Sequence, residues 1–241
     1  MSGHSKWKNI MHKKEKTDSQ RAAVFTKIGR EIVMAVKEGG PDPESNSRLK
    51  DVIAKAKSSN VPNDNIERCI KKAAGGDDDS NYENIQYEGY GPRGIAIIVE
   101  ALTENRNRTA GDVRHYFDKF GGNLGQSGSV SWMFAKKGVM VISKEDYDEE
   151  KFMEDIMDVA AEDYSDEGEV WEIYTSPETF YDVKDALEKK GYEFVSDGIE
   201  QVPSNYITLD NEDDIKNMQK LLDALEDNDD VQDVWHNWDE N

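Results

Sequence analysis

Hydrophobic residues recur along this chain with different spacings, and each spacing predicts a different kind of element. Between residues 18 and 76 they recur every three or four positions, as in Ile28, Ile32 and Val36, which is the spacing of one face of a helix. Residues 95–102 form a continuous run rich in β-branched side chains, which is typical of a buried strand. The pattern predicts a helical amino-terminal part followed by mixed α and β structure.

The amino-terminal part is expected to hold three short helices in a small bundle. The apolar stripes place the first helix at residues 18–38, the second from near 45–47 to about 57, and the third after Pro62. Asp64 and Glu67 have the spacing of a capping box for the third helix, with Asp in place of the usual Ser or Thr. A run of Gly, Asp and Ser then indicates a linker between domains.

The next stretch predicts half of an α+β sandwich, with helices on one face of an antiparallel sheet. The expected elements are a strand up to Tyr90, a strand at 95–102, a helix at 109–120 and a strand at 129–134. Gly121 and Gly122 end that helix and open a glycine-rich loop.

The carboxy-terminal half continues with a β-α-β-α-β order, the split pattern of a small ferredoxin-like unit. We expect a turn and then strands and helices at residues 135–138, 139–143, 152–160, 170–174, 179–190 and 192–195. The last elements, at 206–209, 210–226 and 231–235, have no sheet of their own and are expected to complete the earlier half-sandwich. The sequence thus predicts an α+β protein of three domains, with the last domain inserted in the middle one: residues 1–76, residues 85–136 with 204–241, and residues 137–203.

Charge is divided unevenly along the 241 residues. Residues 1–74 carry 16 Lys and Arg against 9 Asp and Glu, a net charge of +7, whereas residues 75–241 carry 14 against 42, a net charge of −28. A basic head can meet phosphates, and an acidic body repels them and limits the orientations in which they bind. Keeping the protein in solution is the simpler explanation of the acidic excess.

The basic head interleaves cations with an aromatic side chain, an arrangement that suits nucleic acid because charges meet phosphates and an indole stacks on a base. The candidate contacts there are Lys6, Trp7, Lys8, His12, Lys13, Lys14, Arg21, Lys27, Arg30, Arg68, Lys71 and Lys72. An unstructured tail, or a tail docked on the helices, explains the same pattern. A helix-turn-helix is a further reading, but no set of base-reading side chains begins a helix here, which favours contact with the backbone.

Two arginines at the predicted start of the central helix, Arg106 and Arg108, make a candidate phosphate clamp, and Arg114 follows on the same helix. A helix entry with solvated arginines is the alternative.

Candidate catalytic and metal-binding groups do not assemble into a motif. The four histidines lack the spacing of metal ligands, and the glycines at 121–128 lack the Lys and Ser or Thr of a phosphate-binding loop. We therefore expect no enzyme, no cofactor and no metal. The single Cys69 excludes an intrachain disulfide and suits a reducing cytoplasm. No window approaches the ~20 apolar residues of a membrane-spanning helix, so we expect no membrane partner.

Several motifs together resemble the YebC/PmpR family over essentially the whole chain. They are Gly3-His4-Ser5-Lys6-Trp7, Phe25-Thr26-Lys27, Tyr87-Glu88-Gly89-Tyr90-Gly91-Pro92, Asn105-Arg106-Asn107-Arg108-Thr109 and Gly121-Gly122-Asn123-Leu124-Gly125. The departures are Arg93, where the family usually has Gly, and Ala22-Ala23, in a segment that is usually more basic.

The resemblance implies a three-domain cytoplasmic protein and two alternative roles. Members are usually described as transcriptional regulators that bind DNA. Relatives, including a mitochondrial translational activator, point instead to the ribosome and to relief of stalling at proline-rich stretches. The acidic body of this chain would be compatible with basic ribosomal proteins as partners, beside ribosomal RNA. The residues themselves support contact with nucleic acid, and the lack of a base-reading helix favours RNA or the ribosome.

Overall fold

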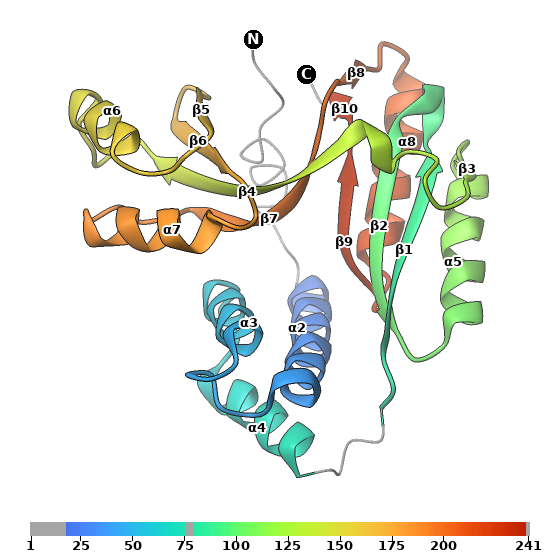
Figure 1. Cartoon of the computed structure of the whole chain (residues 1–241). Coiled ribbons are helices and arrows are strands. Elements are labelled where there is room, and N and C mark those ends of the chain that lie inside the picture. The colour runs from blue at the N-terminus through green and yellow to red at the C-terminus, as the bar shows by residue number, and fades with distance from the viewer. Residues whose placement is uncertain (1–17, 76–79, 240–241) are drawn as a thin grey trace. The chain divides into compact units, whose positions relative to one another are not determined.

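The fold was analysed in a computed structural model, which describes residues 18–75 and 80–239 (Figure 1). The chain divides into two compact units, each described here by itself. The first, called the amino-terminal unit, contains described residues 18–129 and 210–234. The second, called the ferredoxin-like unit, contains residues 130–209 and 235–239. The α+β class is confirmed, because a helical region precedes antiparallel sheets. The predicted domain limits stay a prediction.

Three helices open the amino-terminal unit, and their apolar stripes face one another. They are α2 (Asp18–Gly39), α3 (Ser47–Ser58) and α4 (Asn63–Ala74). The predicted stripe residues Ile28, Ile32 and Val36 are buried in a common core with residues of the other two helices. Burying an aliphatic side chain of this size contributes about 1.5–3 kcal/mol, so this stripe holds the bundle together.

Two side-chain caps were misjudged or missed from the sequence. Asp64 and Glu67 form no capping box, because α4 begins at Asn63 after Pro62 and has no side-chain cap. Asn46 caps α3 instead: its carboxamide oxygen accepts the Leu49 N–H at 3.0 Å. Its amide nitrogen also donates to two carbonyls at the end of α2, so one buried Asn fixes the turn between the two helices.

A four-stranded sheet in the order β3-β1-β2-β9 completes this unit. Its elements are β1 (Glu83–Tyr90), the 3-10 turn η1 (Pro92–Gly94), β2 (Ala96–Thr103), α5 (Arg106–Lys119), β3 (Asn123–Leu124), α8 (Glu212–Glu226) and β9 (Val231–His236). Strand β9 closes the sheet beside β2, as predicted for residues 231–235. The predicted strand at 206–209 does not join this sheet, because β8 (Ile207–Thr208) pairs with β10 (Trp238–Asp239) in a separate two-stranded sheet. The short strand β3 was not predicted.

Two glycines let the helices of this unit approach the sheet. A Cβ at Gly89 would stand 2.7 Å from Phe117 of α5, and one at Gly91 would stand 2.9 Å from Met218 of α8. Positions two apart on extended backbone point to the same side. Helices α5 and α8, which also contact each other, therefore cover the same face of the sheet (Figure 1).

The ferredoxin-like unit has a four-stranded antiparallel sheet in the order β5-β6-β4-β7. Its elements are η2 (Ser131–Met133), β4 (Phe134–Ser143), α6 (Glu149–Met157), β5 (Asp163–Asp166), β6 (Val170–Thr175), α7 (Phe180–Lys189), β7 (Ser196–Pro203), β8 (Ile207–Thr208) and β10 (Trp238–Asp239). The order β-α-β-β-α-β is the split βαβ arrangement. Phe152 and Trp171 stack at 3.9 Å in its core.

Three predictions for this part of the chain were wrong, two of strands and one of a turn. Residues 129–133 form no strand: Ser131–Met133 make the 3-10 turn η2, with Val130 before it buried and Trp132 74% exposed, and Phe134 already begins β4. Residues 135–138 are not a turn but the start of β4, which pairs with β7 from Phe134 to Val141. The first residues of β4 are largely exposed and include two lysines, and such a polar, exposed segment is easily taken for a turn.

The third error concerns residues 192–195, which precede β7 and do not form a strand. Tyr192 is buried among the core residues of the two helices, so its apolar ring is anchored without a sheet. Strand β5, which pairs with β6, was missed because its four residues include two aspartates.

Candidate nucleic-acid interface

The predicted contacts of the amino-terminal tail cannot be placed. Lys6, Trp7, Lys8, His12, Lys13 and Lys14 lie outside the described residues. Arg21 belongs to α2, but its side chain is also outside the description. These seven contacts stay predictions.

Helix α4 carries three of the five remaining cations of the predicted basic head, all in exposed positions. Arg68, Lys71 and Lys72 are all exposed. Among the described residues Arg68 forms no ion pair, and Lys71 has only a long contact of 3.9 Å to Glu67, which is also exposed. Exposed pairs at this spacing contribute only about 0.3–0.5 kcal/mol, so Lys71 is available to a stronger anion. The carboxyl-terminal half of α4 is thus an accessible cationic surface.

Lys27 and Arg30 of α2 are engaged within the protein instead. The Lys27 ammonium donates to the carbonyl oxygen of Glu226, the last residue of α8. Arg30 donates to the Asp229 carbonyl oxygen at 2.6 Å, just beyond that helix. Cations stabilise the carboxyl terminus of a helix, where carbonyl groups lack partners. Both side chains therefore have a structural role that their positions in the sequence did not indicate.

One buried carboxylate, Asp230, joins Arg30 to the predicted phosphate clamp. Arg30 donates to one carboxylate oxygen at 2.7 Å and Arg108 donates to the other at 2.8 Å. The hydroxyls of Thr109 and Thr103 also donate to the second oxygen, at 2.8 and 3.2 Å. The side chain of Arg30 is 18% exposed and that of Arg108 is 54% exposed. The start of α5 therefore lies beside the middle of α2.

The charge of Asp230 is maintained by these donors. Burial raises the pKa of this carboxyl, but the hydrogen bonds from Arg108, Thr109 and Arg30 outweigh burial and leave the pKa below its usual value. Asp230 thus stays ionised at neutral pH and orients both guanidinium groups.

Arg106 and Arg114 remain open on α5. Both are exposed, and neither forms an ion pair within the described parts of the chain. Arg106 is the first residue of α5, and Asn105 before it caps the helix by accepting the Arg108 N–H at 3.1 Å. Of the two clamp arginines, Arg106 is therefore free to meet an external anion, whereas Arg108 already has a carboxylate partner.

The glycine-rich loop after α5 is held against strand β1. The buried carboxylate of Glu88 accepts the Gly128 N–H at 2.9 Å, and the Glu88 carbonyl oxygen accepts the Gly125 N–H at 2.8 Å. Two of the loop's backbone donors are therefore used internally. No spacing in the sequence linked Glu88 to this loop, which lies about 40 residues further along the chain.

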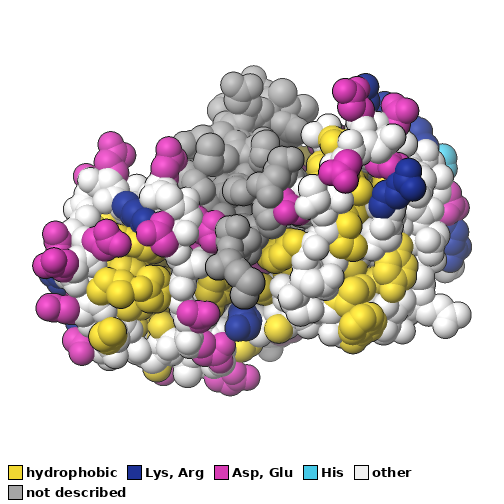
Figure 2. All heavy atoms as spheres, turned by 90° about the horizontal axis from the view of Figure 1, so that it is seen from above, with side chains coloured by type: hydrophobic (Ala, Val, Ile, Leu, Met, Phe, Trp, Pro, Cys, Tyr) yellow, Lys and Arg dark blue, Asp and Glu magenta, His cyan; other side chains and the backbone are white. Residues whose placement is uncertain are grey.

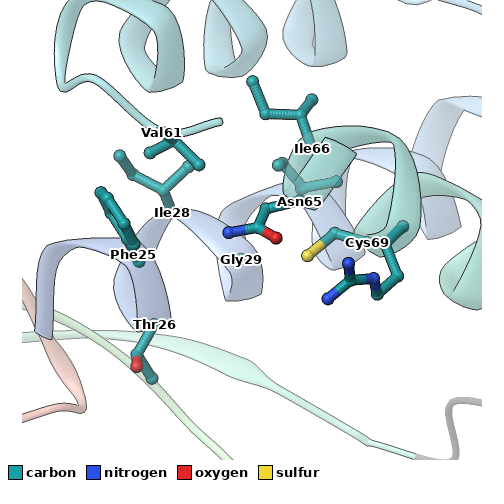
Figure 3. A pocket seen from close by; sticks show the side chains of 10 residues that line it. Phe25, Thr26, Ile28, Gly29, Val61, Asn65, Ile66 and Cys69 are labelled. Carbon is teal, nitrogen blue, oxygen red and sulfur yellow. The ribbon is translucent and has the colours of Figure 1, made fainter. Parts of the chain in front are cut away.

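A groove of about 270 Å³ between α2 and α4 was missed by the sequence reasoning (Figure 3). Its lining is mostly apolar, with an amide and a guanidinium group among it: Phe25, Thr26, Ile28, Gly29, Ile32, Val61, Asn65, Ile66, Arg68 and Cys69. Phe25 belongs to the predicted apolar stripe of α2 but is only partly buried. Helical spacing predicted that the Phe25 ring faces inward, but it could not predict that neighbouring residues leave part of the ring uncovered.

Acidic side chains are scattered over the face shown in Figure 2, where basic ones are few. The described residues contain no cluster of three or more side chains fit to hold a metal ion. No described helix has the length and hydrophobicity needed to cross a membrane.

Two family models match the chain in succession. The "TACO1/YebC protein N-terminal domain" matches residues 5–76, and the "TACO1/YebC second and third domain" matches residues 82–238. The chain belongs to the TACO1/YebC family. The resemblance inferred from the motifs is thereby confirmed.

Similar proteins agree over almost the full length of this TACO1/YebC member. A relative from Acetivibrio thermocellus is 61% identical over 239 residues, which is 99% of each chain. One from Caldicellulosiruptor bescii is 57% identical over 241 residues, covering 100% of this chain and 99% of the relative. Both are named "Probable transcriptional regulatory protein". A crystal structure of a conserved hypothetical protein from Aquifex aeolicus is 46% identical, with a TM-score of 0.85 over 98% of this chain and 97% of that one.

Proposed function

We propose that this protein is a nucleic-acid-binding regulator of gene expression that meets phosphates through α4 and the start of α5. The observation that carries the proposal is a set of exposed cations, Arg68, Arg106 and Arg114, that form no ion pair with any described residue, in a unit otherwise rich in carboxylates. Arginine binds phosphate through two parallel N–H donors, so such a set suits a polyanion. The names of the relatives support a regulatory role.

Asp230 supports the proposed interface because it links the helical bundle to the start of α5. It holds Arg30 of α2 and Arg108 of α5 on its two oxygens, which brings the start of α5 to the helical bundle. A polyanion that runs along the bundle can therefore reach Arg106. The acidic excess of residues 75–241 repels the same ligand elsewhere and restricts how it binds.

A specific feature of α4 favours RNA, including ribosomal RNA, over duplex DNA as the target. Helix α4 begins with exposed carboxylates, Asp64 and Glu67, and its cations start only after them, at Arg68. A recognition helix of the helix-turn-helix type places its amino-terminal residues against base edges in the major groove. Carboxylates there meet the phosphate-lined groove unfavourably, so α4 is suited to backbone contact rather than to reading duplex bases.

Sedimentation of cell lysate through sucrose gradients at low and high salt tests the proposal. A ribosome-associated regulator migrates with ribosomal particles at low salt and leaves them at high salt, because phosphate contacts are lost as counterions compete. A DNA-binding regulator stays near the top of the gradient and shows ~10³-fold or greater preference for a specific duplex over random DNA. A protein that does neither, and binds neither RNA nor DNA at 50 mM salt, contradicts the proposed function.

A further inference from the structure

We propose that the groove between α2 and α4 receives an unpaired nucleobase of single-stranded RNA. The groove is bounded within the amino-terminal unit and is visible from close by in Figure 3. This inference rests on the proposed function and adds to it a site for the base, beside the contacts to phosphate.

The walls of the groove suit the flat apolar faces of a base. Phe25 is a partly buried aromatic side chain at the groove, and the buried Ile28 and Ile66 line it from the two helices. A base that stacks on an aromatic ring is bound more tightly than the backbone alone, whatever its sequence. Pockets for drug-sized ligands span about 300–1,000 Å³, so a groove of 270 Å³ suits a ligand as small as one base.

The polar side chains at the groove suit the edge of a base and its phosphate. Figure 3 shows the side chains of Asn65, Phe25 and Cys69 pointing toward the same space. The Asn65 carboxamide forms no hydrogen bond with another described side chain or backbone group, although it lies beside apolar walls. It offers both a donor and an acceptor, as the edge of a base requires. Arg68 also lines the groove and forms no ion pair in the described chain, so its guanidinium group can meet the adjoining phosphate.

The concave shape selects an unpaired base. Bases in a duplex are stacked, and extruding one costs a few kcal/mol, whereas RNA loops and single strands present unstacked bases without that cost. Charge complementarity selects a polyanion over an apolar protein segment, because residues 1–74 carry a net charge of +7 in a chain of net charge −21. A single strand of RNA satisfies both conditions.

Binding measurements on the full-length protein with four labelled ten-nucleotide probes test the assignment. The probes are single-stranded RNA, single-stranded DNA, an abasic backbone of the same length and charge, and duplex DNA. We expect RNA to bind at least 5-fold more tightly than the abasic backbone, which corresponds to about 1 kcal/mol of stacking. Single-stranded DNA, whose bases are also unpaired, is expected to bind more tightly than the abasic probe.

Gly29 provides a matched pair of variants. A Cβ at Gly29 would lie 3.7 Å from the Cys69 sulfur, an ordinary contact, so alanine fits there. Gly29→Leu extends a larger side chain into the groove and leaves every cation in place, whereas Gly29→Ala is the control. We expect Gly29→Leu to abolish the preference for RNA over the abasic probe and Gly29→Ala to retain it. Should Gly29→Leu fail to fold, Asn65→Ala replaces it, with an expected 3-fold or greater loss of the same preference.

Cys69 reports directly on occupancy, because it lines the groove and is the single cysteine of the chain. We expect RNA to slow alkylation of Cys69 several-fold in the unsubstituted protein and in Gly29→Ala, and the abasic probe to leave the rate unchanged.

Three outcomes overturn the groove assignment while leaving the proposed function in place. They are equal binding of RNA and the abasic probe, an unchanged RNA preference in Gly29→Leu, and protection of Cys69 by duplex DNA as strong as by RNA. A protein that binds none of the four probes at 50 mM salt contradicts the proposed function itself.

Discussion

Each unit contains a buried carboxylate whose negative charge is balanced by cationic side chains and hydroxyl groups. The two carboxylates differ in where along the chain these partners lie. Asp155 of the ferredoxin-like unit accepts from Lys190 at 2.7 Å, from the Tyr192 hydroxyl at 2.9 Å and from Lys151. The lysine donors hold the pKa of Asp155 far below its usual value, led by Lys151. Asp230 of the amino-terminal unit has two arginines and two threonine hydroxyls instead.

Asp155 and Asp230 differ in how far along the chain their donors lie. The donors to Asp155 lie at most 37 positions away, within one α+β fold. The donors to Asp230 lie 121 to 200 positions away and come from β2, α5 and α2. Asp155 therefore stabilises a local fold, whereas Asp230 joins segments that meet only in the complete unit. The candidate interface depends on the second kind of contact.

The largest expected effect is that of Asp230→Ala. The mostly buried Arg30 guanidinium and two buried hydroxyls lose their acceptor, and removing one partner of a buried pair costs about 3–5 kcal/mol. We expect the free energy of unfolding of the amino-terminal unit to fall by about 4 kcal/mol, measured by hydrogen exchange of its peptides. The exposed Asp229→Ala is the matched control, with a change below about 0.5 kcal/mol. If Asp229→Ala lowered the free energy of unfolding as much as Asp230→Ala, the contacts of the Asp230 carboxylate would not be the cause of the loss.

A smaller effect is expected for Asp155→Ala, about 2–3 kcal/mol, confined to peptides of residues 130–209. Lys151 is 61% exposed and regains water when the carboxylate is lost, so the buried Tyr192 hydroxyl bears most of the cost. Asp158→Ala, whose side chain is 72% exposed, is the control. Loss of protection in peptides of α2 or α5 would contradict the view that Asp155 acts locally.

Acid should weaken the contacts of Asp155 and of Asp230 with their donors. The resulting loss of stability should be smaller than in either alanine variant, because a protonated carboxyl still accepts hydrogen bonds. The folded-state pKa values of Asp155 and Asp230 are depressed, so their contribution is fully present above about pH 4, the unfolded value for Asp, and is lost as pH falls through the folded pKa. We expect the Tm difference between the unsubstituted protein and each alanine variant to be constant from pH 7 to 5 and to narrow toward pH 3. A difference that stays constant to pH 3 would contradict the assignment.

The smallest stability effects separate the two clamp arginines. Arg108→Ala should lower the free energy of unfolding by about 1 kcal/mol, because a half-exposed partner of Asp230 is removed. Arg106→Ala should change it by less than about 0.5 kcal/mol and should weaken RNA binding, since this arginine is exposed and has no ion pair with the described part of the chain. Thermal unfolding and RNA binding of both variants test this. A stable Arg106→Ala protein with unchanged RNA affinity would remove Arg106 from the interface.

Local elements followed from the sequence because their cause is local. The β-branched run at 95–102 became β2, and Ile28, Ile32 and Val36 became the buried stripe of α2, since burial follows periodicity. Strand β4 was placed too short because its exposed half carries lysines, and pairing with β7 rather than apolar content holds that half.

The candidate interface could be predicted from the sequence only in part, because the partners of its side chains lie far away along the chain. The sequence singled out Arg30, Arg106 and Arg108 as equivalent cations. The structure separates them through Asp230, which lies 200 positions from Arg30. No periodicity encodes such a contact. The groove at Phe25 was missed for a related reason: helical spacing predicts that a residue faces inward, and says nothing of how completely its neighbours cover it.

Crosslinking by ultraviolet light of the full-length protein to the nucleic acid bound to it in cells tests the central claim most directly. The crosslinked peptides are identified by mass spectrometry. The proposed interface predicts crosslinks in α4, within residues 63–75, and at the start of α5, within residues 105–116, carried by RNA nucleotides. Crosslinks confined to residues 130–209, or an absence of nucleic acid on the purified protein at low salt, would contradict it.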